Sequence, residues 1–161
     1  MLRLGHVPDD FGLSYAIPRL EGNINICKRN VGVDDFRGIS ISPVLSKVLE
    51  HCILNRFSKY FVTSENQFGF KKSVGCSQCI NTVRSVINHY VSHGNTVNLC
   101  ALDVSKAFDR TNFHGIYVRL MQKLVPCELL TMLEDWFSKC FTCVKWISVF
   151  STFFQLTCGV R

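Results

Sequence analysis

Residues 97–109 read Val97-Asn98-Leu99-Cys100-Ala101-Leu102-Asp103-Val104 followed by Ser105-Lys106-Ala107-Phe108-Asp109. The first eight form a short apolar run that ends beside an acid, which is typical of a buried central β-strand. We therefore expect a strand over 97–104 with Asp103 exposed at its C-terminal end. An ionised carboxylate there needs a cation, a metal or a helix to cap, because an isolated buried charge is costly. The spacing of Asp103 and Asp109 alone leaves these alternatives open, and a cap or a salt bridge is the more common one.

The segments on either side of this run predict an α+β chain. Apolar residues recur at helical spacing over 43–61, 76–92, 113–124 and 127–140, with Ser42 expected to cap the first helix and Pro43 to stand at its first position. Residues 144–158 alternate and are rich in β-branched and aromatic side chains, which predicts a hairpin. Residues 1–42 have an irregular pattern, with an edge-strand candidate around Pro18 at 15–20. Helices, a strand, more helices and a hairpin, in this order, are typical of the α+β class.

The composition is that of a globular domain or of part of a larger one. The chain has 161 residues, of which 47% are hydrophobic and 19% charged, which excludes a disordered tail. We expect an intracellular protein, because no run of 18 apolar residues lacks a charge and the N-terminus lacks a signal-peptide core. The formal charge of +6 favours a polyanionic partner only slightly. The nine cysteines are then expected to be reduced thiols that act as small buried groups.

Four stretches carry a resemblance to a known family. Residues 101–109, with their Ser-Lys-Ala-Phe-Asp ending, resemble the first palm motif of reverse transcriptases from non-LTR retrotransposons of the LINE or jockey-like kind. Residues 35–47 resemble the fingers block, residues 67–72 the next block, and residues 158–161 the start of the block that usually continues Gln-Gly. The resemblance implies a right-hand polymerase fold, with residues 1–33 as an irregular N-terminal arm and residues 34–161 as a partial reverse transcriptase domain of fingers and first half of the palm.

The resemblance also implies a two-metal nucleotidyl transferase site. Asp103 matches the first catalytic aspartate, which would hold Mg²⁺ together with the backbone carbonyl of Val104, and hard Mg²⁺ prefers such oxygen ligands. Phe108 matches the aromatic residue beneath the incoming sugar, where it would favour deoxynucleotides. Without the resemblance, a core aromatic is an equally good interpretation of Phe108.

Three basic residues match positions that face phosphates in the family. Arg37 and Lys71 lie where fingers segments meet the incoming triphosphate or the template backbone, and Lys72 follows. Each residue taken alone is more often a solvated surface charge. Gln67 and Gly69 are expected to shape the turn that carries the two lysines.

The intact family enzyme implies an RNA template, a DNA primer and a deoxynucleoside triphosphate as partners, a cytoplasmic or nuclear location, and neither a membrane nor a protein partner. Three positions depart from the family pattern: Gly38 replaces a common Pro, Phe113 a common His, and residues 73–77 lack the usual Arg-Ser-Thr. The sequence also lacks the Phe/Tyr-x-Asp-Asp motif that supplies the remaining catalytic aspartate. We therefore expect this polypeptide not to polymerise alone.

Two alternatives to a polymerase fragment remain. The pairs Cys76/Cys79 and Cys140/Cys143 could form a four-thiolate zinc site in a nucleic-acid-binding module, although the gap of 60 residues between them favours ordinary thiols. His89 and His93, at helical spacing, could be a metal pair, although exposed polar residues at a helix end are more common. The chain could also be a retroelement remnant without a selected function.

Overall fold

Residues 1–20 and 31–159 are described in the computed structural model of this chain. They form two compact units, one from residues 1–60 together with 106–161 and the other from residues 61–105. Cys27 and the last two residues of the 158–161 block lie outside the described residues. The chain mixes helices with a small sheet, which is compatible with the predicted α+β class.

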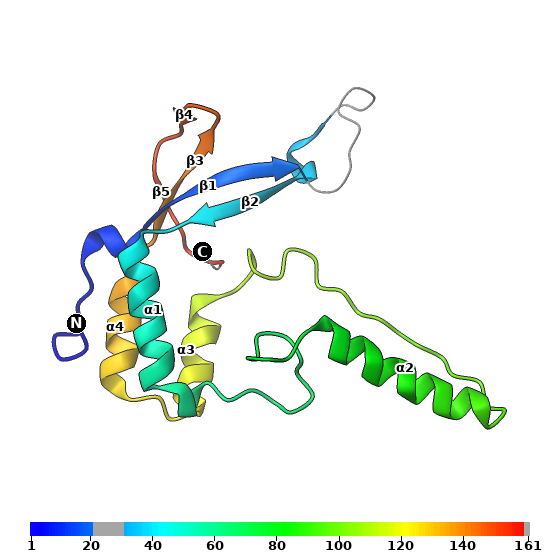
Figure 1. The fold of residues 1–161 in the computed structure, drawn as a ribbon. Helices are drawn as coiled ribbons and strands as arrows, with labels where there is room; N and C mark the ends of the chain where they lie inside the picture. Colours follow the sequence, from blue (N-terminus) through cyan, green and yellow to red (C-terminus); the bar gives the residue numbers. More distant parts are fainter. Residues whose placement is uncertain (21–30, 160–161) are drawn as a thin grey trace. The chain divides into compact units, whose positions relative to one another are not determined.

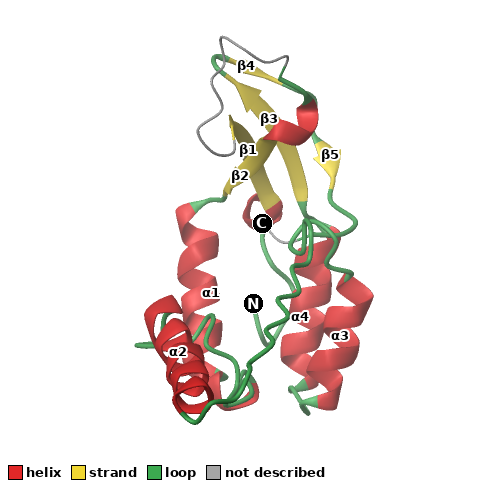
Figure 2. Ribbon diagram, turned by 90° about the vertical axis from the view of Figure 1, so that its right-hand side faces the viewer, coloured by secondary structure: helices red, strands yellow, loops and turns green. Residues whose placement is uncertain are grey.

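The first unit contains a sheet in which β1 (Leu13–Leu20) runs between β2 (Phe36–Ile41) and β3 (Phe141–Trp146). β1 is antiparallel to β2 and parallel to β3 (Figures 1 and 2). The other edge of β3 pairs with β4 (Val149–Phe150) and β5 (Phe154–Gln155), both antiparallel. The hairpin predicted over 144–158 is therefore present, and it begins earlier, at Phe141.

The prediction of an edge strand at 15–20 is wrong, because β1 has neighbours on both sides. Pro18 is compatible with this position for a local reason. β3 pairs with β1 only from Leu13 to Ala16, so Pro18 has a neighbouring strand on the β2 side alone, where it lies opposite Gly38. A proline lacks the N–H that a strand with partners on both sides would use. The segment expected to be an irregular arm thus supplies the central strand of the sheet.

The helices of the first unit are α1 (Val44–Arg56), α3 (Phe113–Gln122) and α4 (Cys127–Ser138), accompanied by the short 3₁₀ turns η1 (Asp9–Gly12), η2 (Val33–Asp35) and η3 (Ser58–Tyr60). Their apolar spacing predicted all three α-helices, with ends that shift by a few residues. The expectation that Ser42 caps α1 is wrong: Pro43 is the N-cap residue, and no side chain accepts a capping hydrogen bond there. In α3, by contrast, the Asn112 side chain accepts a hydrogen bond of 2.9 Å from the His114 backbone N–H.

The core of the first unit is built around α4. Leu129 and Met132 are fully buried and Trp136 is 3% exposed. The Trp136 Nε1–H donates to the carbonyl oxygen of Phe11 over 3.0 Å, which ties the N-terminal segment to the helix. Most of the α1 apolar residues stay exposed, and Ile53 is the one that enters this core, with 7% exposure.

A charged cluster holds the same N-terminal segment to the end of α4. The Asp135 carboxylate accepts hydrogen bonds of 2.8 Å from both the Val7 N–H and Lys139 Nζ. Lys139 Nζ also donates to the Val7 carbonyl at 2.9 Å and pairs with Asp9 at 3.2 Å. The hydrogen bond from Lys139, followed by that from Val7, lowers the pKa of Asp135.

The second unit contains α2 (Cys76–Ser92), whose bounds match the predicted helix. The predicted central strand over 97–104 is wrong: residues 95–104 have no regular secondary structure, and Leu99 and Leu102 are 68% and 92% exposed. A strand needs hydrogen-bonding neighbours, and none of the described strands pairs with this segment. An apolar, strand-like sequence is therefore left uncovered.

Two further findings concern the whole chain. Cys140 and Cys143 are buried as expected, but the prediction of buried thiols is wrong for a larger group of exposed cysteines: Cys52, Cys76, Cys100, Cys127 and Cys158. Among residues 1–20 and 31–159, no helix is long and apolar enough to cross a membrane.

Candidate functional site

Arg37 lies on β2, which the chain enters through the 3₁₀ turn η2. The turn is closed by Asp35, whose carboxylate accepts the Gly32 N–H at 2.9 Å. In the sheet register, Arg37 lies opposite Arg19 of β1, and both side chains are exposed. The guanidinium groups of Arg19 and Arg37 thus come from neighbouring strands at this end of the β1–β2 pair. Two such groups side by side suit a phosphate-rich ligand.

Residues 105–110, which follow Asp103 and Val104, form a turn in place of a helix or strand. Lys106 has a positive φ of 52° there, and its Nζ lies 2.9 Å from Oδ1 of Asp34. This hydrogen bond and the accompanying charge attraction lower the pKa of Asp34 and raise the pKa of Lys106. The ion pair joins the palm-like motif to the residue just before the fingers-like block.

The same turn meets the beginning of the 158–161 block. The Gly159 N–H donates to the Thr111 carbonyl at 2.8 Å, and Asn112 forms an isolated β-bridge with Cys158. Gly159 has a φ of +92°, and a Cβ there would lie 3.3 Å from the carbonyl oxygen of Asp109. Glycine is favoured here on both grounds. Phe108, 59% exposed, therefore lies in a turn that packs against the 158–159 segment.

In the second unit, the turn over 67–72 carries the two candidate lysines. Lys71 Nζ donates to the carbonyl oxygen of Ser64 over 2.6 Å, and Gln67 Nε2 donates to that of Gly69 over 3.2 Å. This hydrogen bond supports the expectation that Gln67 shapes the turn, whereas Gly69 contributes a backbone carbonyl that any residue could offer. Lys71 also closes the loop, a structural role that its position in a motif did not reveal, whereas Lys72 is exposed.

Asp103 lies in the irregular segment of the second unit, where its carboxylate is exposed. Within the described parts of the chain, its side chain makes no hydrogen bond or ion pair. Val104 is 69% exposed. Their carboxylate and carbonyl oxygens are hard ligands of the type that Mg²⁺ prefers, so the donor chemistry fits this ion. No group of three or more His, Cys, Asp or Glu side chains gathers to hold a metal in the described ranges.

The six candidate residues divide between the two units. Arg37 and Phe108 belong to the first, and Lys71, Lys72, Asp103 and Val104 to the second. Within the first unit, the structure brings the palm-like turn against Gly159 and against Asp34. The sequence did not single out the Lys106–Asp34 pair, because 72 residues separate its members. Two features of the sequence could have indicated this pair: Lys106 lies inside the palm-like motif, and Asp34 lies next to the fingers-like block.

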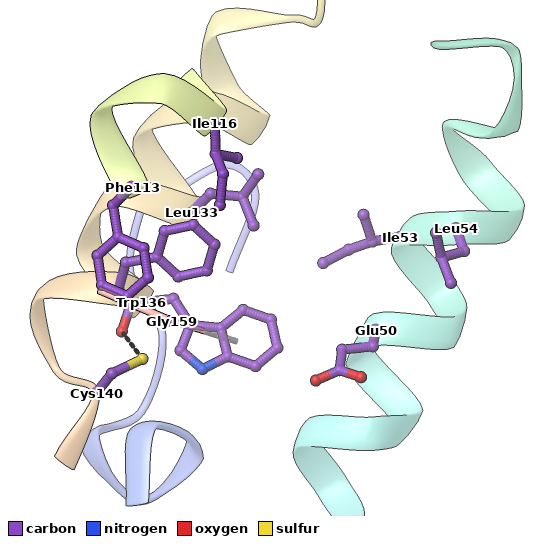
Figure 3. Close-up of a pocket in the computed structure, with 10 residues that line it drawn as sticks. Glu50, Ile53, Leu54, Phe113, Ile116, Leu133, Trp136, Cys140 and Gly159 are labelled. Carbon is purple, nitrogen blue, oxygen red and sulfur yellow. Dashed lines mark hydrogen bonds between the residues drawn. The ribbon is translucent and has the colours of Figure 1, made fainter. Parts of the chain in front are cut away.

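An apolar pocket of about 320 Å³ lies between α1 and the α3–α4 pair in the first unit. Figure 3 shows Glu50 and Ile53 of α1 pointing toward the side chains of the other two helices. Glu50 is the single carboxylate in the lining, and it pairs with Lys47 at 3.0 Å. None of the candidate residues lines this pocket, which is a gap in packing between helices.

The cysteine-based zinc module is not favoured. Cys140 and Cys143 are buried, and the Cys140 thiol donates to the Trp136 carbonyl. Cys76 and Cys79 lie in the first turn of α2, in the other unit.

No protein-family model matches the chain, but three known proteins are similar to it. It is 28% identical over 143 residues to the "RNA-directed DNA polymerase from mobile element jockey" of Drosophila funebris, covering 84% of this chain and 15% of that protein. It is 34% identical over 101 residues to the "Retrovirus-related Pol polyprotein from type-2 retrotransposable element R2DM" of Drosophila melanogaster, covering 63% and 10% respectively.

A third match is the "Probable RNA-directed DNA polymerase from transposon X-element" of Drosophila melanogaster, 29% identical over 130 residues, which is 78% of this chain and 14% of that protein. The chain thus spans between 10% and 15% of the length of these relatives. The resemblance predicted from the four sequence blocks is confirmed: the chain is similar to the RNA-directed DNA polymerases of non-LTR retrotransposons.

Proposed function

We propose that this chain supplies the fingers and the first half of the palm of a right-hand RNA-directed DNA polymerase, with residues 34–161 as the polymerase part. The observation that carries the proposal is the similarity to the jockey polymerase over 84% of the chain. Two contacts of the palm-like turn in the first unit support it: the turn pairs with Asp34, the residue before the fingers-like block, and it packs against Gly159 of the 158–161 block.

In this proposal, Asp103 and the Val104 carbonyl hold Mg²⁺. When bound, the metal would lower the pKa of the primer hydroxyl and stabilise the leaving pyrophosphate. The exposed Asp103 carboxylate is accessible to such an ion. Phe108 contacts the sugar of the incoming nucleotide in this proposal, and its side chain is 59% exposed.

The basic candidates bind phosphate groups in this proposal. Arg37, exposed on β2, offers a planar guanidinium to phosphate oxygens. Lys72 is the more available lysine of its turn, because Lys71 already donates to the Ser64 carbonyl. The proposed partners are an RNA template, a DNA primer and a deoxynucleoside triphosphate.

Primer extension on an RNA template tests the proposal. The protein is expressed from the complete reading frame that encodes these residues, with Asp103→Asn compared with Glu65→Gln, an exposed carboxylate of the same unit. We expect Asp103→Asn to abolish Mg²⁺-dependent extension and Glu65→Gln to leave it unchanged. Wild-type activity in Asp103→Asn would remove Asp103 from the site, and inactivity of the wild-type frame would refute the proposal for this protein.

Binding of an RNA–DNA duplex by the 161-residue chain tests the phosphate contacts separately. The logarithm of the affinity falls linearly with the logarithm of the salt concentration, and each lost phosphate contact reduces that slope by about 1. Arg37→Gln and Lys72→Gln should each show this change, whereas Lys123→Gln, at the end of α3, should not. An unchanged slope in both test variants would contradict the assignment.

A further inference from the structure

The last turn of α2 carries two histidines four residues apart. The ring centres of His89 and His93 lie 4.7 Å from each other, and both side chains are exposed. Residues at this spacing are neighbours on one face of a helix. Nothing in the proposed polymerase function uses them.

The hydrogen bonds of His93 determine which of its nitrogens can bind a ligand. Its Nδ1 lies 2.6 Å from the carbonyl oxygen of His89. A carbonyl oxygen only accepts hydrogen bonds, so Nδ1 carries the proton. In the neutral imidazole, Nε2 then has the lone pair. Metal-binding histidines in proteins have this same arrangement, with the other ring nitrogen donating to a backbone carbonyl.

Ser92 reinforces the arrangement. Its Oγ donates to the same His89 carbonyl at 2.9 Å and lies 3.3 Å from His93 Nδ1. The hydroxyl therefore joins the backbone of one histidine to the ring of the other. The His93 ring is held in one orientation before any ligand arrives, which reduces the entropy lost on binding.

The separation of the two rings suits a shared ion. Two imidazoles that bind one ion through nitrogens at about 2.1 Å place their ring centres about 5 Å apart. The observed 4.7 Å is close to this value. We propose that His89 and His93 form a two-imidazole site for a divalent transition metal ion such as Ni²⁺, Cu²⁺ or Zn²⁺, with water completing the coordination.

This site differs in chemistry from the proposed polymerase centre. Imidazole suits Zn²⁺, Cu²⁺ and Ni²⁺, whereas carboxylate and carbonyl oxygens suit Mg²⁺. The His89–His93 pair should therefore bind Ni²⁺ in the presence of a large excess of Mg²⁺. Loss of one site leaves the other intact, so the two proposals stand or fall independently.

Calorimetric titration of the reduced 161-residue chain with NiCl₂, in excess MgCl₂, tests the proposal. The variants are His89→Gln, His93→Gln and their combination, and His51→Gln on α1 is the matched control. Each single variant should weaken Ni²⁺ binding by about tenfold or more, and the double variant little further, because chelation needs both rings. His51→Gln should bind like the wild type. Far-UV circular dichroism checks that each variant keeps its helices.

Nuclear magnetic resonance of the histidine rings gives a local readout that exposed thiols cannot imitate. At substoichiometric paramagnetic Ni²⁺, the signals of His89 and His93 should broaden before those of His6, His51 and His114. Equal affinity in the wild type and the double variant, or equal broadening of all five histidines, would overturn the proposal.

Discussion

Lys106 Nζ lies 2.9 Å from Asp34 Oδ1, so an ion pair spans 72 residues of sequence and joins the palm-like turn to the segment before the fingers-like block. Both side chains are exposed, 57% for the lysine and 91% for the aspartate. Water and salt therefore screen the attraction, so the pair contributes little to the stability of the fold.

Replacement of Lys106 by methionine should raise the pKa of Asp34. The hydrogen bond and the positive charge of Lys106 hold that pKa below its ordinary range in the wild type. A carboxyl with a lowered folded-state pKa stabilises the protein above its unfolded pKa of about 3.9, and this contribution is lost as the pH falls through the folded value. A ¹³C titration of the Asp34 carboxyl measures the change. Lys47→Met, which breaks the pair with Glu50 instead, should leave Asp34 unaltered, and identical Asp34 titrations in all three proteins would contradict the contact.

Truncation of Leu129 should be among the more damaging core changes. Its side chain is fully buried in α4, and Leu→Ala at such a position costs about 2 to 5 kcal/mol. Leu45 on α1 is 66% exposed, so the same substitution there should change stability by less than about 0.5 kcal/mol. Urea unfolding measures both. Equal losses would show that the α1 apolar face is covered in solution.

The helices were predictable, whereas the strands were predictable only in part, for a physical reason. The hairpin was found, but the strand over 97–104 is absent and the strand at 15–20 is central instead of at an edge. The spacing of apolar residues is set within one helix, so Cys76–Ser92 was found with its bounds. A strand depends on partners that the local sequence does not name. Residues 97–104 have the composition of a buried strand but no paired neighbour among the described strands. Pro18 is tolerated in a central strand because the pairing of β1 with β3 stops at Ala16.

The site was predictable only as a set of motifs. The blocks around Asp103 and Arg37 were recognisable because their residue types and order are specific. The hydrogen bond from Lys71 to Ser64 and the ion pair from Lys106 to Asp34 depend on the folded chain path, which no local pattern contains.

Removal of the Tyr117 hydroxyl should not destabilise the protein. The oxygen is buried without a hydrogen-bond partner in the described residues, and burial raises the pKa of Tyr117 to about 12, with Glu134 and Cys140 adding to the effect. Since an unpaired buried hydroxyl is costly, Tyr117→Phe should leave stability unchanged or raise it by about 1 kcal/mol. Alkaline absorbance titration should lose a step near pH 12 in this variant. Tyr90→Phe, at a half-exposed position, is the control, and a loss of more than about 1 kcal/mol in Tyr117→Phe would reveal a partner for the hydroxyl.

Addition of one methyl group at Gly12 should disrupt the junction between η1 and the end of α4. A Cβ there would lie 2.0 Å from the carbonyl oxygen of Lys139 and 2.6 Å from its carbonyl carbon. Both atoms belong to the backbone, so relief requires Lys139 to move, and with it the contacts of its side chain with Asp135 and Val7. Gly12→Ala should therefore lower the free energy of unfolding by about 3 kcal/mol or more, because extra volume is forced into a packed site.

Gly69→Ala is the matched control, because a Cβ at Gly69 meets no atom within 4 Å. This change should leave stability the same or raise it by up to about 1 kcal/mol, through the smaller conformational freedom of the unfolded chain. Urea unfolding measures the free energy of unfolding of both variants, and so compares the same added methyl group at the crowded Gly12 and at the open Gly69. A Gly12→Ala protein as stable as the wild type would mean that η1 and α4 do not approach each other in this way. The parallel pairing of β1 with β3 starts immediately after this junction, at Leu13 and Phe141. Such a result would therefore also question the register of these two strands.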